Sequence, residues 1–393
     1  MQHQVATRQR ASLSAAPAHR ATWTQVAAWR AARHHLDARV PRRRMLSLVS
    51  ELCGLHAQVM SSAELTLWAR VDGVSRDSLA RALWRDRSLV KMWAMRGTLH
   101  VFRSNEHAAW CAALRTYELR VRRSWARYLG IEPEDMEGLV EAIDEALDGR
   151  ELTREELAAE VSRRRASRPL AEALTHSWGG LLKPASYRGS LCFAPSRGQR
   201  VRFTNPRSWL GVEGVADGSE EEALRDVLRR FVATNGPAST QEIARWWGGP
   251  SATRIEELIG SLGDEVAPVD VDGVRAWALA GHADAIASAE PARSVRLLPT
   301  FDQYVIGTTK HSHELMPGAF RDRVHRQAGW VSPVLLVDGM IEGVWSHAKK
   351  GKRASVAIEP FRKQPAWVRK GAEAEAELLA GYLDGELELT WEA

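Results

Sequence analysis

The clearest pattern of hydrophobic and polar positions lies between residues 220 and 280. An amphipathic helix is predicted over EEEALRDVLRRFVATNG and ends at the Asn-Gly-Pro sequence 235–237. The Ser-Thr pair 239–240 is expected to cap a short helix, TQEIARWWG, and Ser251 to start a third, SATRIEELIGSL. EVAPVDV and VRAWALA then alternate like two strands around an Asp-Gly turn at 272–273. Three helices followed by a two-stranded hairpin are the order of a winged helix-turn-helix unit.

The same order is predicted twice upstream. A helix over 134–148 precedes a capping-box signature at Thr153 and Glu156, a helix over RPLAEALTHSWGGLL (168–182) and a hairpin around Gly198. Nearer the N-terminus, TWTQVAAWRAARHHL, RRRMLSLVSELCGL and SRDSLARALWR are predicted helices, and SLVKMWAMRGTLHVF turns at an Arg-Gly pair. Three such units indicate a tandem array.

Beyond residue 293 the pattern becomes β-rich, with a hairpin expected at Val-Asp-Gly-Met 337–340, a helix over 365–385 and a last strand, ELELTWE. We interpret this part as a small β-barrel or curled sheet. The predicted fold class is α+β, with three tandem winged helix-turn-helix domains followed by a C-terminal β-barrel. The expected domains are a basic N-terminal segment (1–20), three winged helices (21–110, 111–212 and 213–290) and the barrel with its helix (291–393).

Positive charge is concentrated in two blocks of the sequence. Residues 1–44 hold nine Arg and one acid, and residues 293–370 hold fourteen Lys or Arg against six acids, although the whole chain carries only +5. Such blocks are typical of a protein that neutralises phosphates. The alternative is an Arg-rich composition with solvated charged faces. Candidate phosphate contacts in these blocks are Arg42, Arg43, Arg44, Lys349, Lys350, Lys352 and Arg353.

Composition narrows the class of protein further. Hydrophobic content of 45% and charged content of 26% fit a globular protein, and no uncharged apolar run approaches the roughly 18 residues that span a membrane. Three widely spaced cysteines fit a reducing compartment. We therefore expect a cytoplasmic, nucleoid-associated protein without a membrane partner. Trp246 and Trp247 are adjacent, so one of them is expected to face outward.

The sequence lacks the motifs of several common chemistries. No GxGxxG, GxxxxGK[ST], HExxH or paired CxxC motif is present, which removes support for dinucleotide, nucleoside triphosphate and standard zinc-protease chemistry. Cys53 and His56 have CxxH spacing, with His34 and His35 nearby, but two further ligands at fixed spacing are not evident. We predict no metal site and no cofactor.

His56 and Gln58 form the more informative polar pair. Gly54 is expected to end the preceding helix. At positions i and i+2 the two side chains would be splayed by about 200° in a helix, whereas in an extended or turn segment both would point the same way. If His56 and Gln58 act together, residues 55–58 must therefore be non-helical. The alternative is that His56 is merely exposed and Gln58 caps the next helix.

A second polar cluster lies in MRGTLH (95–100). Arg96 is expected at the turn of a hairpin and His100 on its outgoing strand. In a DNA-binding wing, Arg96 would reach a phosphate or the minor groove, and His100 is the second candidate DNA contact of this hairpin. The alternative is a solvated turn arginine and a core or edge histidine.

Three segments together carry a family resemblance. GLHAQVMSSAELTLWAR (54–70), MRGTLHVF (95–102) and LLPTFDQYVIGTTKHSHELMPGAF (297–320) with SPVLLVDGMIEGVW (332–345) resemble the winged-helix DNA glycosylases typified by AlkZ and YcaQ. The resemblance spans residues 22–390. It implies three winged helices and a β-barrel around duplex DNA. It also implies excision of N7-alkylguanine-type lesions, including bulky natural-product adducts and interstrand crosslinks.

The resemblance also implies a catalytic motif, Gln-x-Gln in one branch and Gln-x-Asp in the other. His56 and Gln58 occupy its positions, so this chain carries a His-x-Gln variant that departs from both patterns at the first residue. N7 alkylation makes guanine cationic and a good leaving group, so the remaining task is to stabilise the sugar cation and place a water. Gln58 can hold that water, and a neutral histidine can hold it and accept its proton.

The expected function is therefore that of a monofunctional DNA glycosylase in base excision repair or self-resistance to a genotoxin. The expected partner is double-stranded DNA containing alkylated bases, bound by a monomer. A non-catalytic winged-helix regulator is the main alternative; it predicts two-fold symmetric operator binding and no dependence on His56. A scaffold that has lost activity is the third.

Overall fold

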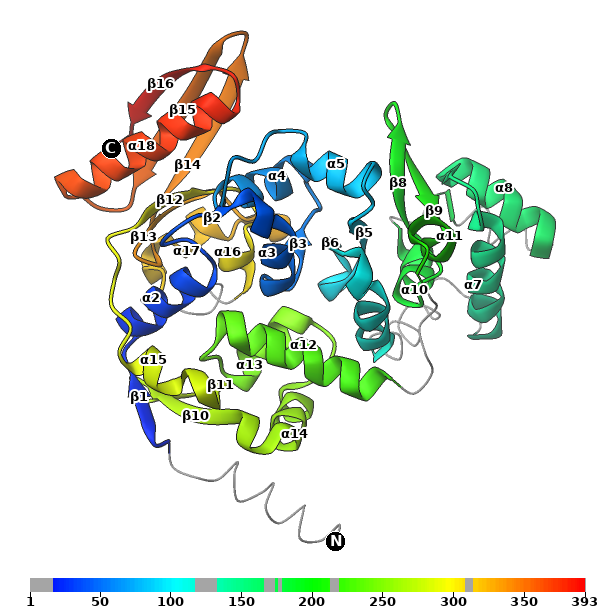
Figure 1. Cartoon of the computed structure of the whole chain (residues 1–393), viewed down its shortest axis with the longest axis horizontal. Coiled ribbons are helices and arrows are strands. Elements are labelled where there is room, and N and C mark those ends of the chain that lie inside the picture. The colour runs from blue at the N-terminus through cyan, green and yellow to red at the C-terminus, as the bar shows by residue number, and fades with distance from the viewer. Residues whose placement is uncertain are drawn as a thin grey trace, which may run out of the picture. The chain divides into compact units, whose positions relative to one another are not determined.

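A computed structural model describes residues 17–116, 133–165, 174–175, 179–212, 219–307 and 314–392 of the chain. The fold is a mixture of helices and small sheets, of the predicted α+β class (Figure 1). Most of the basic segment 1–20 and of the helix expected over 168–182 lies outside the described residues. Within these residues, no helix is long and apolar enough to cross a membrane.

The helices and strands have the following bounds. The α-helices are α2 (Trp23–Arg33), α3 (Met45–Glu51), α4 (Met60–Trp68), α5 (Ser78–Trp84), α7 (Pro133–Leu147), α8 (Arg154–Arg165), α10 (Lys183–Tyr187), α11 (Pro206–Leu210), α12 (Glu220–Asn235), α13 (Thr240–Trp247), α14 (Ala252–Leu262), α15 (Ala283–Ala287), α16 (Gln303–Gly307), α17 (Arg321–Val324) and α18 (Ala366–Tyr382). The strands are β1 (His19–Ala21), β2 (Val40–Pro41), β3 (Leu55–His56), β4 (Val71–Asp72), β5 (Leu89–Trp93), β6 (Leu99–Arg103), β7 (Leu152–Thr153), β8 (Cys192–Arg197), β9 (Arg200–Thr204), β10 (Val266–Val271), β11 (Val274–Leu279), β12 (Val295–Leu298), β13 (Val334–Val337), β14 (Met340–Lys350), β15 (Arg353–Pro360) and β16 (Glu386–Trp391).

The chain folds as two compact units. One comprises Met1–Ser78, Leu228–Trp246 and Ser251–Ala393, and the other Leu79–Val227 and Trp247–Pro250. The first unit thus contains both ends of the chain, and the second is almost one continuous stretch of sequence.

Helices α13 and α14 begin where the sequence predicts. The Glu242 carboxylate accepts from the Ser239 amide at 2.8 Å, and the Glu242 amide donates to Ser239 Oγ at 3.2 Å, so Ser239 forms the capping box. Ser251 caps α14 by accepting from the Arg254 amide at 3.2 Å. The hairpin of β10 and β11 turns at Asp272, whose φ is +47°, as predicted. The sheet also has a third strand that sequence analysis missed, because β1 pairs in parallel with β10.

The expectation that Trp246 or Trp247 faces outward is wrong. Their exposed fractions are 4% and 1%. Trp246 packs on Phe231 of α12, with ring centroids 4.4 Å apart. A helix as short as α13 can be covered on two faces by neighbouring elements, which the sequence pattern does not reveal.

The C-terminal part of the first unit is a five-stranded sheet in the order β12-β13-β14-β15-β16. All pairs are antiparallel except β15 and β16, which are parallel. The hairpin expected at 337–340 and the helix α18 are confirmed. Buried residues of four strands and α18 share one core cluster. In the described residues β12 and β16 are edge strands, and the sheet does not close into a barrel.

In the second unit, two antiparallel hairpins accompany the helices. β5 pairs with β6 on either side of the predicted Arg96-Gly97 turn, and β8 pairs with β9 around Gly198. Thr153 and Glu156 form the predicted capping box at the start of α8, with reciprocal bonds of 2.8 and 3.3 Å. Trp93 of β5 packs on Phe193 of β8 at 4.8 Å between ring centroids, which joins the two hairpins in one core.

Candidate active site

The segment that carries His56 and Gln58 leaves helical geometry, as the paired reading of these residues requires. After α3, Cys53 and Gly54 adopt left-handed backbone conformations with φ of +57° and +86°. The Gly54 amide donates to the Val49 carbonyl at 2.9 Å and closes the helix end. The chain then enters β3, and α4 starts at Met60. The splay that a helix would impose on His56 and Gln58 is therefore absent.

The two side chains differ in their surroundings. His56 is 6% exposed, and its imidazole stacks on the Phe301 ring with 5.0 Å between centroids and 30° between planes. Gln58 is exposed. The stacking fixes the plane of the imidazole, whereas the Gln58 side chain reaches the surface. That the two side chains act together remains a prediction.

A buried network holds the Phe301 loop against the His56 segment. Gln303 donates from its side-chain amide to the Gly54 carbonyl, two residues before His56. Asp302 forms a bidentate ion pair with Arg70, with both N–O distances 2.7 Å and both side chains 0% exposed. Arg70 also donates to the His34 carbonyl at 2.9 Å, and Asp302 accepts from the Tyr304 amide at 2.9 Å. These bonds compensate the buried charges of Arg70 and Asp302, and they fix the chain on both sides of Phe301.

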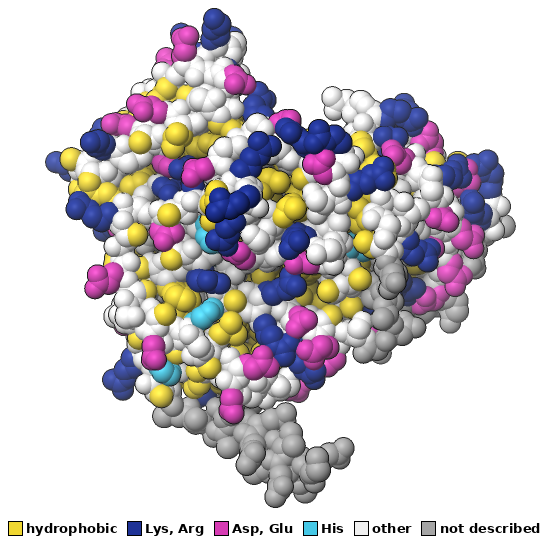
Figure 2. Space-filling model, viewed as in Figure 1, with side chains coloured by type: hydrophobic (Ala, Val, Ile, Leu, Met, Phe, Trp, Pro, Cys, Tyr) yellow, Lys and Arg dark blue, Asp and Glu magenta, His cyan; other side chains and the backbone are white. Residues whose placement is uncertain are grey.

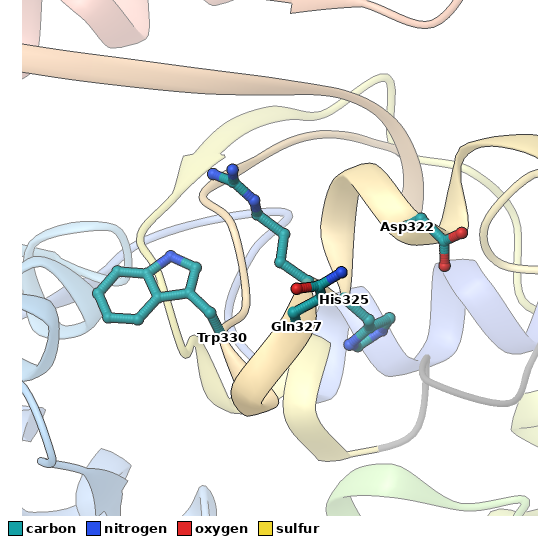
Figure 3. Close-up of a pocket in the computed structure, with 5 residues that line it drawn as sticks. Asp322, His325, Gln327 and Trp330 are labelled. Carbon is teal, nitrogen blue, oxygen red and sulfur yellow. The ribbon is translucent and has the colours of Figure 1, made fainter.

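A pocket opens beyond Phe301. The Phe301 ring meets the Trp330 ring edge to face, with centroids 5.0 Å apart and planes at 69°. Trp330 is 45% exposed and lines a pocket of about 850 Å³. Figure 3 shows Trp330 on one side and Asp322 on the other, with His325 and Gln327 between them. The candidate catalytic histidine is thus joined to this pocket by two successive ring contacts.

The candidate phosphate-binding residues of the first unit form two groups, and both groups lie at the surface of that unit. Arg42, Arg43 and Arg44 form one exposed turn before α3, and Arg44 pairs with Glu51 at 2.7 Å. Within the described part of the chain, Arg42 and Arg43 make no ion pair.

The other group occupies the tip of the long β14–β15 hairpin. All four side chains are exposed: Lys349, Lys350, Lys352 and Arg353. Lys349 donates to the Asp384 carbonyl at 2.6 Å and Arg353 lies 3.5 Å from Glu388, whereas Lys350 and Lys352 have no ion pair with any described residue. The end of this hairpin is the outermost part of the sheet in Figure 1, and Figure 2 shows Lys and Arg side chains at this end with Asp or Glu side chains beside them.

Arg96 and His100 lie on the β5–β6 hairpin of the second unit. Arg96 is half-buried at the turn, with a φ of +57°. His100 is 0% exposed, its Nδ1 lies 3.2 Å from the Thr98 carbonyl oxygen, and its ring stacks on Phe102. A direct contact of this imidazole with DNA would require the hairpin to open, so we carry only Arg96 forward as a DNA-binding candidate.

The histidines near Cys53 do not form a metal site in this structure. His34 Nε2 lies 3.0 Å from the Asn235 amide oxygen, and burial holds the pKa of His34 well below its usual value. His35 pairs with Glu51 at 2.5 Å. Among the residues that the structure describes, no group of three or more His, Cys, Asp or Glu side chains could hold a metal ion.

Comparisons with known proteins agree with the sequence motifs. A family model described as DNA glycosylase AlkZ-like matches residues 49–382. The interstrand DNA cross-link repair glycosylase of Streptomyces sahachiroi is 34% identical over 359 residues, which are 91% of this chain and 95% of that protein. The solved structure of Streptomyces sahachiroi DNA glycosylase AlkZ matches with a TM-score of 0.87 and 33% identity, over 95% of this chain and 100% of the other.

The fold and these matches define an enzyme of DNA repair, a DNA glycosylase. The chain belongs to the AlkZ-like DNA glycosylase family. Its substrate is therefore DNA, and membership of an enzyme family argues against the purely regulatory class considered from the sequence.

Sequence reasoning missed the residues that support His56. Phe301, Asp302 and Gln303 stand in the family-like segment TFDQ, but their partners are more than 200 positions away in the sequence. Three polar or aromatic residues directly after an apolar strand were the available signal. Trp330 gave none, because it is one of sixteen tryptophans in the sequence and no local pattern distinguishes it.

Proposed function

We propose that this enzyme hydrolyses the N-glycosidic bond of bulky N7-alkylated guanines in duplex DNA and unhooks interstrand crosslinks. The observation that carries the proposal is the non-helical segment holding His56 and Gln58, in a chain 34% identical to an interstrand DNA cross-link repair glycosylase. The enzyme is monofunctional and acts as a monomer, in base excision repair or in resistance to a genotoxin made by the cell itself. It works in the cytoplasm.

His56 and Gln58 are the proposed catalytic residues. Alkylation at N7 leaves a positive charge on the guanine, so the base departs without a strong general acid. Gln58 holds the attacking water below C1′ by hydrogen bonding, and His56 in its neutral form orients the same water and accepts its proton. The stack on Phe301 supports this role because an imidazole with a fixed ring plane loses little freedom in the transition state.

The proposed architecture is three winged helices followed by the open five-stranded sheet and α18, which stand where the sequence predicted a barrel. Its support is the order of helices and hairpins, most directly α12, α13, α14, β10 and β11. The boundaries proposed are 21–110, 111–212, 213–290 and 291–393. DNA is contacted by Arg42, Arg43, Arg44 and Arg96 and by the basic tip of the β14–β15 hairpin, which offers unpaired ammonium groups to phosphates.

The proposal is tested by base release. Purified enzyme in excess over a duplex that carries one N7-guanine adduct is expected to release the modified base and leave an abasic site with an intact strand. Product analysis by mass spectrometry identifies the base, and a denaturing gel before and after alkali separates simple hydrolysis from strand cleavage. Tight binding of several adducted duplexes with no release would contradict the proposal and favour a DNA binder without activity.

Duplex binding is expected to be strongly salt-dependent. If about six phosphates are neutralised, the affinity falls by about 10³ or more between about 50 and 200 mM salt, because condensed counterions are released on binding. Replacing Lys350 and Lys352 together by alanine should flatten the plot of log affinity against log salt by about two, since each contact contributes about 0.9. Fluorescence anisotropy of a labelled duplex measures this slope.

The control for this measurement is Arg163→Ala, which removes an exposed positive charge of α8 outside both basic blocks. It is expected to leave the slope unchanged. A slope equal to that of the native chain in the double lysine variant would mean that the hairpin tip points away from DNA.

A further inference from the structure

The roles proposed for His56 and Gln58 do not account for the pocket beside Phe301. Its lining residues are Asp322, His325, Arg326, Gln327 and Trp330, and its volume of about 850 Å³ lies in the range of sites for drug-sized molecules. One wall is aromatic and the others carry polar side chains. Such a combination suits a ligand that is planar and apolar on its faces and polar at its edges.

The Trp330 ring is partly exposed on a constrained loop and is not packed into the core, so it is accessible to a ligand. Four large hydrophobic side chains are exposed within the described ranges, and Trp330 is the tryptophan among them. Its loop is closed by the bond from the Arg326 amide to the Trp330 carbonyl, 2.8 Å long, and by the bond from the Ser332 amide to the Val324 carbonyl, also 2.8 Å. A ring on so constrained a loop loses little conformational freedom when it binds a ligand.

The place of the pocket relative to His56 indicates which part of a substrate would reach it. Phe301 contacts His56 with one ring face and the Trp330 ring edge to face, each at 5.0 Å between centroids. The sugar that reacts has to lie at His56 and Gln58. N7 of guanine lies on the major-groove edge of the base, so a substituent there extends away from the sugar and the pairing edge. The pocket is separated from His56 by the Phe301 and Trp330 rings. It is therefore placed to receive the substituent and not the sugar.

We propose that this pocket is the subsite for the adduct, and that Trp330 is the platform on which a planar aromatic substituent at N7 stacks. The inference rests on the proposed function and adds to it the subsite and the residue that would contact the substituent. Trp330 is a specificity-determining residue in this assignment, because an N7-methyl group has no ring to stack on it.

The test compares two duplexes of the same sequence under enzyme excess. One carries a guanine alkylated at N7 by a polycyclic aromatic epoxide, and the other carries N7-methylguanine. Trp330→Ala is expected to slow release of the aryl adduct by about 10-fold or more, which is the usual cost of removing one aromatic stacking partner, and to change release of N7-methylguanine by less than about 2-fold. Trp330→Phe should keep most of the rate on the aryl adduct.

Leu378→Ala is the matched control, because Leu378 is an exposed apolar residue of α18 with an exposed fraction of 52%. It should leave both rates unchanged. Equal losses on both duplexes in Trp330→Ala would show that Trp330 acts through Phe301 on His56, and would overturn the inference. No loss on either duplex would overturn it as well.

Binding measured by anisotropy separates this inference from the proposed function. If the native enzyme releases neither base, the proposed function fails, and the subsite is judged by affinity alone. A preference of the native enzyme for the aryl duplex over the methyl duplex that disappears in Trp330→Ala supports the subsite. Absence of that preference in the native enzyme contradicts it.

Discussion

Replacing Gln58 by alanine is expected to lower the single-turnover rate of base release by about 10²-fold while leaving DNA affinity nearly unchanged. The lost hydrogen bond would act on the water in the transition state and not on the bound duplex, so the effect falls on the chemical step. Gln58 is exposed and lies in the short connection between β3 and α4, so its truncation should not disturb the core. Gln241→Ala, an exposed glutamine of α13, is the matched control and should keep the native rate.

The His56 variants separate the chemistry of the imidazole from its packing. His56→Ala should lose at least as much rate as Gln58→Ala, since it removes both the hydrogen bond and the stack on Phe301. His56→Phe keeps the stack without the nitrogens and should be equally slow, whereas His56→Gln should keep substantial activity. If His56 accepts a proton, the native rate falls at acidic pH and the glutamine variant loses that dependence. Equal rates in all of these variants would remove the pair from the mechanism.

Replacing Asp302 by alanine is expected to lower the free energy of unfolding by about 3–5 kcal/mol. Arg70 would then keep its charge at 0% exposure with only carbonyl acceptors left, and an uncompensated buried charge is costly. The measurement is urea unfolding of the full chain followed by circular dichroism.

An exposed ion pair supplies the comparison for this variant. Arg254 and Glu257 lie 3.0 Å apart on α14 with side chains 41% and 60% exposed. Glu257→Ala should cost less than about 1 kcal/mol, because solvent screens the pair. A cost for Asp302→Ala no greater than that for Glu257→Ala would mean that the Arg70 charge is solvated in the native state.

Local signals in the sequence predicted much of the fold. Ser239 and Ser251 cap helices by bonds to residues three positions ahead, and Asp272 starts a turn between adjacent strands, so each signal and its partner lie close together in the chain. β1 has no such signal. It pairs with a strand that begins at Val266, and nothing within three residues of His19 specifies that partner.

The sequence predicted the break in helical geometry at the candidate site, but not the contacts that support His56. The spacing of His56 and Gln58 after Gly54 indicated that residues 55–58 had to leave helical geometry, and the structure places a short strand and a bend there. The burial of His56 comes from Phe301, and the position of Phe301 comes from the pair of Arg70 and Asp302, 232 residues apart. Tertiary contacts of this range leave no periodic pattern in the sequence, so only the structure identifies them.

The parallel pairing of β1 with β10 sets an order for folding during synthesis. β1 holds residues 19–21, and its partner strand ends at Val271. At about 5–20 residues per second, the ribosome needs roughly 10–50 s to make the intervening chain of about 250 residues. Leu79–Val227, which forms nearly all of the second unit, is translated within that interval. The N-terminal strand thus waits unpaired while the second unit can already fold, so a nascent chain stalled before residue 266 would expose it to pairing with other chains.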